Sequence, residues 1–175
     1  IVGTLLLKAT EDISWLGAFF QSVSARTAGF STYPIGSFTN AGLFTLIVLM
    51  FIGASPGSTG GGIKTSTFFV LMQQVRSLFT KRHLGAFKRS ISAETLSKAS
   101  VISLLSILLC CAGTFLLCIM EPEYSFIQLL FEEVSAFGTV GLSTGITPEL
   151  GSAAKLVLII TMFAGRVGMF TLLSI

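Results

Sequence analysis

Apolar residues along the chain gather in long runs separated by short polar or glycine-rich connections. Two runs, residues 95–120 and 153–175, are long enough to cross a bilayer, which takes about 20 mostly apolar residues in a helix. Two others, residues 13–25 and 125–137, are too short to cross as helices. A turn rich in Gly, Thr and Ser follows each short run at once. This pattern predicts two re-entrant segments that enter a membrane and return on the same side.

A further apolar run, residues 38–79, is interrupted by a glycine-rich stretch. Residues 53–62 read GASPGSTGGG, and five glycines with a proline cannot continue an α-helix. Non-helical backbone at membrane depth is tolerated only where protein or a water-filled cavity covers it. We therefore expect a broken helix whose break lines a pathway.

The chain contains an internal repeat. Residues 26–32 (RTAGFST) align without gaps to residues 138–144 (GTVGLST), and the same offset carries residues 46–53 onto 158–165 and Phe19 onto Phe131. Internal duplication is common in transporters, where the repeats surround a shared site. We interpret each unit as an outer helix, a short re-entrant helix, a T-x-G turn and an inner helix. Residues 1–90 form one unit with a truncated first helix and a basic connection, and residues 91–175 form the other.

Composition supports a membrane environment. Hydrophobic residues make up 52% of the chain and charged residues only 11%, against about 25% in an average soluble domain. The net charge of +3 and the lack of interleaved basic and aromatic residues argue against nucleic acid. Six of the eleven Lys and Arg fall between Arg76 and Lys98. The positive-inside rule places this basic connection, residues 76–98, in the cytoplasm of a multi-pass plasma-membrane protein; a solvated loop of a soluble protein is the alternative.

The two T-x-G turns are suited to holding a cation. A pore selective for a dehydrated alkali cation needs oxygens at close range without fixed charges that would trap the ion, and backbone carbonyls provide them. Glycine accepts the dihedral angles that aim successive carbonyls at one axis, which gives Gly29 and Gly141 a role. The C-terminal dipole of each preceding short helix also favours a cation. The alternative is an ordinary helix-ending turn, because glycine is the commonest residue there.

Two enzyme motifs occur as strings but lack their context. Residues 57–65 resemble a phosphate-binding loop, but Ile63 separates the last glycine from Lys64. Ser55 fits a nucleophile elbow, yet no His, Asp or Glu lies nearby in sequence. We therefore expect no enzyme activity. Charged residues in apolar surroundings usually face a bundle interior, so we expect Arg166 to meet carbonyls of the helix break; Lys64 could do the same or snorkel from a helix end.

Four stretches resemble the third and fourth repeats of the Trk/Ktr/HKT cation transporters, nearest to the bacterial Ktr-type membrane subunit. They are residues 26–32, 53–65, 135–144 and 165–168 (GRVG). The resemblance implies four membrane–pore–membrane repeats around one pore, each giving one filter strand. It implies that the filter strands here are Thr27, Ala28, Gly29 and Phe30, and Thr139, Val140, Gly141 and Leu142. It also implies an intramembrane gate loop with Gly57, Gly60, Gly61, Gly62, Lys64 and Arg166 as its residues. Family members often continue GRVG with Pro-Leu-Thr, where this chain has Met169-Phe170-Thr171.

The resulting expectation is an all-α integral membrane protein that takes up potassium ions. K⁺ would be held by backbone carbonyls of the filter, with no other metal or cofactor. The resemblance implies a homodimer in membrane lipid, seated on a cytoplasmic nucleotide-binding ring that could dock on residues 76–89. Transport of Na⁺ or of both ions stays open because two filter strands lie outside this sequence, and a purely structural membrane domain is the alternative from another class. The chain begins without Met inside an apolar run, so we expect further sequence upstream.

Overall fold

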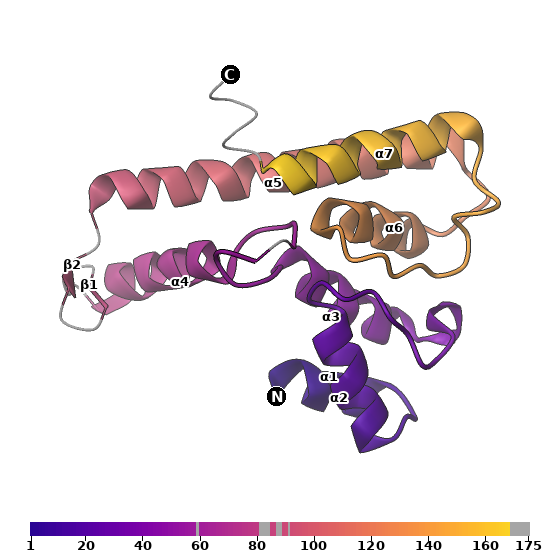
Figure 1. Cartoon of the computed structure of the whole chain (residues 1–175), viewed down its shortest axis with the longest axis horizontal. Helices are drawn as coiled ribbons and strands as arrows, with labels where there is room; N and C mark the ends of the chain where they lie inside the picture. The colour runs from indigo at the N-terminus through magenta and orange to yellow at the C-terminus, as the bar shows by residue number, and fades with distance from the viewer. Residues whose placement is uncertain (59, 81–84, 87–88, 91, 169–175) are drawn as a thin grey trace.

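The computed structural model of the chain is a bundle of helices (Figure 1). It describes residues 1–58, 60–80, 85–86, 89–90 and 92–168. The helices are α1 (Val2–Thr10), α2 (Trp15–Ser24), the 3₁₀ turn η1 (Ile35–Ser37), α3 (Asn40–Phe51), α4 (Thr65–Thr80), α5 (Ala93–Met120), α6 (Phe126–Gly138) and α7 (Ser152–Val167).

Polar residues at the helix starts explain where several helices begin. Side-chain oxygens of Ser14, Thr39 and Ser92 accept hydrogen bonds from the backbone N–H three residues later, at 3.0, 3.1 and 3.2 Å. Such caps satisfy N–H groups that have no partner within the helix. At the start of α6, Gln128 reaches back to the N–H of Ser125 at 3.1 Å. The hydrophobic runs are thus cut into helices by the polar residues between them.

Both halves of the chain follow the same order of helix, short helix, turn and helix. The residue after each outer helix is a glutamate that ties it to the start of its inner helix. Glu11 accepts from the N–H of Thr39 at 2.9 Å, and Glu121 accepts from the N–H of Gly151 at 2.6 Å. The two halves therefore share a polar link that the sequence alignment alone did not reveal.

The expected broken helix is present. α3 ends at Phe51 and α4 begins at Thr65. The chain between them leaves the helix axis and returns: the N–H of Ile63 donates to the carbonyl of Phe51 at 3.2 Å, and Ile52 and Ile63 form an isolated parallel β-bridge. The glycine-rich stretch is therefore a closed loop in the middle of the inner helix.

Two details differ from the sequence expectation. α5 has 28 residues and is the one helix in the described ranges that is long and apolar enough to cross a membrane, whereas α7, expected as a second span, has 16. The connection after α4 also contains a two-residue antiparallel pair, β1 (Gly85–Ala86) and β2 (Arg89–Ser90), so it is not wholly helical. The Met169-Phe170-Thr171 departure and residues 81–84, 87 and 88 of the proposed docking face at 76–89 lie outside the described residues.

The core forms around α6, which packs against α3, α5 and α7. Phe131 and Phe137 of α6 are fully or almost fully buried there. Large apolar side chains of α5 and α7, such as Phe115 and Ile160, are exposed. A buried short helix within a bundle whose outside is apolar suits a lipid environment, because lipid, unlike water, does not penalise exposed hydrocarbon.

Candidate functional site: the paired glycine turns and the glycine loop

The two T-x-G turns lie against each other. Each begins where a short helix ends, Thr27–Phe30 after α2 and Thr139–Leu142 after α6. Gly29 has φ +73° and Gly141 has φ +92°, a backbone conformation that side chains rarely allow. A β-carbon at Gly29 would lie 1.9 Å from the carbonyl oxygen of Val140. Sequence positions 112 apart are thus neighbours in space, and glycine is required for that contact.

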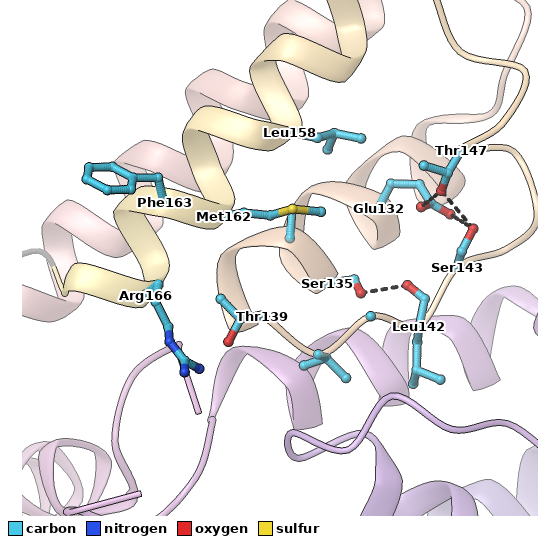
Figure 2. Close-up of a pocket in the computed structure, with 13 residues that line it drawn as sticks. Glu132, Ser135, Thr139, Leu142, Ser143, Thr147, Leu158, Met162, Phe163 and Arg166 are labelled. Carbon is cyan, nitrogen blue, oxygen red and sulfur yellow. Dashed lines mark hydrogen bonds between the residues drawn. The ribbon is translucent and has the colours of Figure 1, made fainter. Parts of the chain in front are cut away.

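A serine at the end of each short helix anchors its turn. The hydroxyl of Ser135 donates to the carbonyl of Leu142 at 2.6 Å, as Figure 2 shows, and Ser24 donates in the same way to the carbonyl of Phe30. The last carbonyl of each turn is therefore directed toward its own helix. This leaves the carbonyls of the three preceding residues as the candidate ion ligands in each strand.

The offset between equivalent residues of the two repeats is 112 in the turns but one residue less in the short helices before them. Ser24 and Phe30 are six positions apart, whereas Ser135 and Leu142 are seven apart. Gln21 and Ser31 likewise differ by ten positions, and Glu132 and Ser143 by eleven. Within the short helices the equivalent positions are therefore 111 apart. The expected match of Phe19 with Phe131 is wrong for this reason, since at an offset of 111 the residue equivalent to Phe131 is Phe20.

The glycine loop lies directly beside the first residue of both turns. The N–H of Gly61 donates to Thr139 Oγ1 at 2.9 Å. A β-carbon at Gly60 would lie 2.5 Å from Thr27 Oγ1, and one at Gly61 would lie 2.9 Å from Thr139 Oγ1. The loop predicted from composition and the turns predicted from the repeat therefore lie in contact, and glycine is the residue that lets the loop approach both threonines.

Two basic side chains hold the loop. Lys64 immediately precedes α4 rather than lying within a helix, and its ammonium donates to the carbonyls of Gly60 and, at 3.4 Å, of Ser58. It therefore binds the loop and does not snorkel away from it. Arg26, to which sequence reasoning gave no role, donates to the carbonyl of Ile52 at 3.0 Å, where the inner helix breaks. The one feature of the sequence that could have pointed to Arg26 was its position just before the T-x-G turn.

Arg166 lies in the last turn of α7, between two cavities. One, of about 600 Å³, is lined by residues 139–143, by Glu132 and Ser135 of α6, and by Met162 of α7. The other, of about 170 Å³, is lined by Gly60, Gly62 and Lys64 of the loop. Figure 2 shows the Arg166 side chain extending from the end of α7 away from Glu132. Arg166 and the glycine loop thus line one cavity, and the contact of Arg166 with carbonyls of the helix break stays a prediction.

Sequence reasoning also missed Glu132, which is only 4% exposed in α6. Its carboxylate accepts hydrogen bonds from Ser143, Thr144 and Thr147 beyond the second turn, and Figure 2 shows those from Ser143 and Thr147. Two adjacent acidic residues in a short apolar segment, Glu132 and Glu133, were the signal that could have found it, because buried carboxylates are rare unless they are paired or hydrogen-bonded.

Comparisons with known proteins converge on one family. The TrkH family model, described as a cation transport protein, matches residues 3–174. Ktr system potassium uptake protein B of Vibrio alginolyticus is 46% identical over 93% of this chain and 36% of its own length. Ktr system potassium uptake protein D of Bacillus subtilis is 42% identical over 95% of this chain and 37% of its length. The chain therefore spans a little over a third of the curated relatives it matches.

A solved structure supports the fold. The crystal structure of the potassium transporter TrkH from Vibrio parahaemolyticus superimposes with a TM-score of 0.79 over 99% of this chain and 40% of that chain, at 24% sequence identity. At this identity the likeness establishes the helical architecture. With the family match over nearly all of its residues, the chain belongs to the TrkH/Ktr family of cation transport proteins.

Proposed function

We propose that this chain forms half of a pore that takes up K⁺ across the cytoplasmic membrane. The observation that carries the proposal is the contact between the two glycine turns, with a glycine loop against the first residue of both. A row of backbone carbonyls above a mobile constriction can select an ion and control its passage. The names of the Ktr relatives, which are potassium uptake proteins, agree with this reading.

The ion ligands in this proposal are the carbonyls of Thr27, Ala28 and Gly29 and of Thr139, Val140 and Gly141. Phe30 and Leu142, which we expected as ligands, act as the anchored ends of the filter strands because their carbonyls accept from Ser24 and Ser135. Carbonyls replace the hydration shell of K⁺ without adding net charge to the pathway. No other metal or cofactor is part of the proposal.

The gate in this proposal is the glycine loop, including Gly57 and Gly60–Gly62, with Lys64 and Arg166 beside it. The hydrogen bonds from Gly61 to Thr139 and from Lys64 to Gly60 would hold the loop in place below the filter. These few polar contacts can break and reform without unfolding the helices on either side. The loop could therefore move while α3 and α4 stay in place.

The proposed topology follows from the repeat. Residues 1–90 and 91–175 would be the third and fourth membrane–pore–membrane repeats, and α2 and α6 the re-entrant pore helices. The Glu11–Thr39 and Glu121–Gly151 links support this division. The basic connection would lie in the cytoplasm. We further propose a homodimer in membrane lipid on a cytoplasmic nucleotide-binding ring. The relatives are named as proteins of a Ktr system, which supports the part of this proposal that the chain works with other components.

A second candidate function is transport of Na⁺ together with K⁺. Another relative, 39% identical over 97% of this chain and 38% of its own length, is named potassium/sodium uptake protein NtpJ of Enterococcus hirae. Selectivity depends on all strands around a pore, and this chain supplies two of them in our proposal. A competition experiment between the two ions decides between these candidates.

Gly141 provides a direct test of the filter assignment. In the full-length protein, we expect Gly141→Ser to weaken discrimination of K⁺ against Na⁺ by roughly fivefold, equivalent to about 1 kcal/mol. A β-carbon there would meet nothing within 4 Å, but the backbone at φ +92° would have to change and move neighbouring carbonyls. Rubidium-86 uptake by liposomes, titrated with Na⁺, measures the change.

Ala153→Ser serves as the control for this variant, because it adds a hydroxyl to an exposed position in the first turn of α7, away from the turns. We expect its selectivity to equal that of the unmodified protein. Unchanged selectivity in Gly141→Ser itself would remove Gly141 from the filter.

A further inference from the structure

Glu132 is the most heavily hydrogen-bonded side chain near the two turns. Its Oε1 accepts from Ser143 Oγ at 2.9 Å, from the N–H of Thr144 at 2.7 Å and from Thr144 Oγ1 at 2.9 Å. Its Oε2 accepts from Thr147 Oγ1 at 2.5 Å. Figure 2 shows Glu132 of α6 with Ser143 and Thr147 of the chain that follows the second turn. Both carboxylate oxygens are thus occupied by protein donors.

These donors fix the chain immediately after the second filter strand. Ser143 directly follows Leu142, whose carbonyl accepts from Ser135 on the same face of α6. Glu132 and Ser135 are three residues apart, so they lie on neighbouring turns of one helix. A carboxylate accepts hydrogen bonds at both oxygens and donates none, and bonds to a charged acceptor are about twice as strong as neutral ones. The strand end is thereby fastened to the pore helix at two points.

The other strand is fastened more weakly. Gln21 occupies the equivalent position in α2 once the one-residue slip is included, and its amide donates to Ser31 Oγ at 2.6 Å. Its amide oxygen is buried and has no hydrogen-bond partner among the described residues. A neutral amide with one bond therefore stands where the second repeat has a carboxylate with four. The repeats differ in how firmly they hold their strands.

We propose that Glu132 is a positioning residue for ion selectivity: through Ser143, Thr144 and Thr147 it sets the spacing of the carbonyls in residues 139–141. K⁺ and Na⁺ differ in size, so discrimination requires that the carbonyls keep their separation when the smaller ion is present. Glu132 keeps the carbonyls at that separation without contacting the ion. This inference rests on the proposed function of residues 139–142 as a filter strand.

The test uses Glu132→Gln in the full-length protein reconstituted in liposomes. Glutamine keeps the size of the glutamate side chain but carries no charge. Its NH₂ group is a donor, and it would face hydroxyl and N–H groups that donate to Glu132 in the unmodified protein. We expect the Na⁺ concentration that halves rubidium-86 uptake to fall roughly fivefold, equivalent to about 1 kcal/mol. Thr147→Val removes the bond to Oε2 and the hydrogen bond between Thr147 Oγ1 and Ser143 Oγ, but leaves the three bonds to Oε1. We expect a fall of about twofold from it.

Glu133→Gln is the matched control. Glu133 is the neighbouring residue, fully buried, and it accepts from Thr161 Oγ1 on α7 at 2.8 Å. An amide oxygen keeps that bond, and the second carboxylate oxygen has no hydrogen-bond partner among the described residues. We therefore expect Glu133→Gln to leave the sensitivity to Na⁺ unchanged.

The outcomes separate this inference from the proposed function. If the unmodified protein takes up no rubidium, the proposed pore itself fails. If the unmodified protein prefers K⁺ and Glu132→Gln shows the same sensitivity to Na⁺, the positioning role is overturned while the pore stands. An equal shift in Glu133→Gln would also overturn it, since any change in α6 would then suffice. If Glu132→Gln does not assemble, unaltered selectivity in Thr147→Val rejects the role.

Discussion

Gly29→Ala in the full-length protein should reduce discrimination of K⁺ against Na⁺ by roughly a hundredfold, equivalent to about 2.7 kcal/mol. The new β-carbon would lie 1.9 Å from the carbonyl oxygen of Val140, which is backbone of the neighbouring strand and cannot rotate away as a side chain would. The φ of +73° adds strain of about 1–3 kcal/mol for a residue with a side chain. Both strands must therefore move, and the carbonyls of both move with them. Na⁺ competition against rubidium-86 uptake measures the loss.

Gly57→Ala is a matched control, because it introduces backbone strain without a steric clash. Gly57 has φ +82°, but a β-carbon there would meet nothing within 4 Å. We expect this variant to keep its ion discrimination even if its uptake rate changes. Size-exclusion chromatography shows whether each variant still assembles. A fully selective Gly29→Ala protein would mean that the two turns do not share one filter.

Deleting Gly60–Gly62 should raise the rate of uptake roughly tenfold, because the deletion removes the obstruction and its hydrogen bonds together. The loop contacts the first residue of each turn, through Gly61 to Thr139 and through the close approach of Gly60 to Thr27. Without those glycines nothing in the described residues brings the loop to both threonines. Initial rates of rubidium-86 uptake at equal protein density give the comparison.

Lys64→Met offers a milder form of the same experiment. It keeps the loop and an unbranched side chain one atom shorter, but removes the donor to the carbonyls of Gly60 and Ser58. We expect a smaller increase, roughly twofold to threefold. If both variants transport at the unmodified rate while remaining assembled, the loop is not a gate.

Much of the fold could be predicted because it depends on features that sequence states directly. The length and apolarity of α5 and the glycine-rich break before α4 are properties of consecutive residues. The repeat located both turns, and the structure brings Gly29 and Val140 into contact as a shared site requires. The 16-residue α7 was harder, since an apolar run continues in sequence beyond the point where Gly168, at φ +88°, ends the helix.

The contacts that the sequence did not predict depend on how each helix is rotated about its own axis. One residue of slip turns a helix by about 100°, so an ungapped alignment paired Phe19 with Phe131 and hid the correspondence of Gln21 with Glu132. The roles of Arg26, Lys64 and Glu132 likewise depend on backbone groups far away in sequence or on the local course of a loop. No residue pattern fixes those contacts before the helices are packed.

The most direct test of the proposed pore is rubidium-86 uptake by liposomes that hold the unmodified full-length protein, with excess K⁺ or Na⁺ as competitor. We expect K⁺ to suppress the uptake and Na⁺ at the same concentration to leave most of it. Equal suppression by the two ions would favour the mixed-cation function, and no uptake in protein that is assembled would contradict the proposal that these turns form an ion pathway.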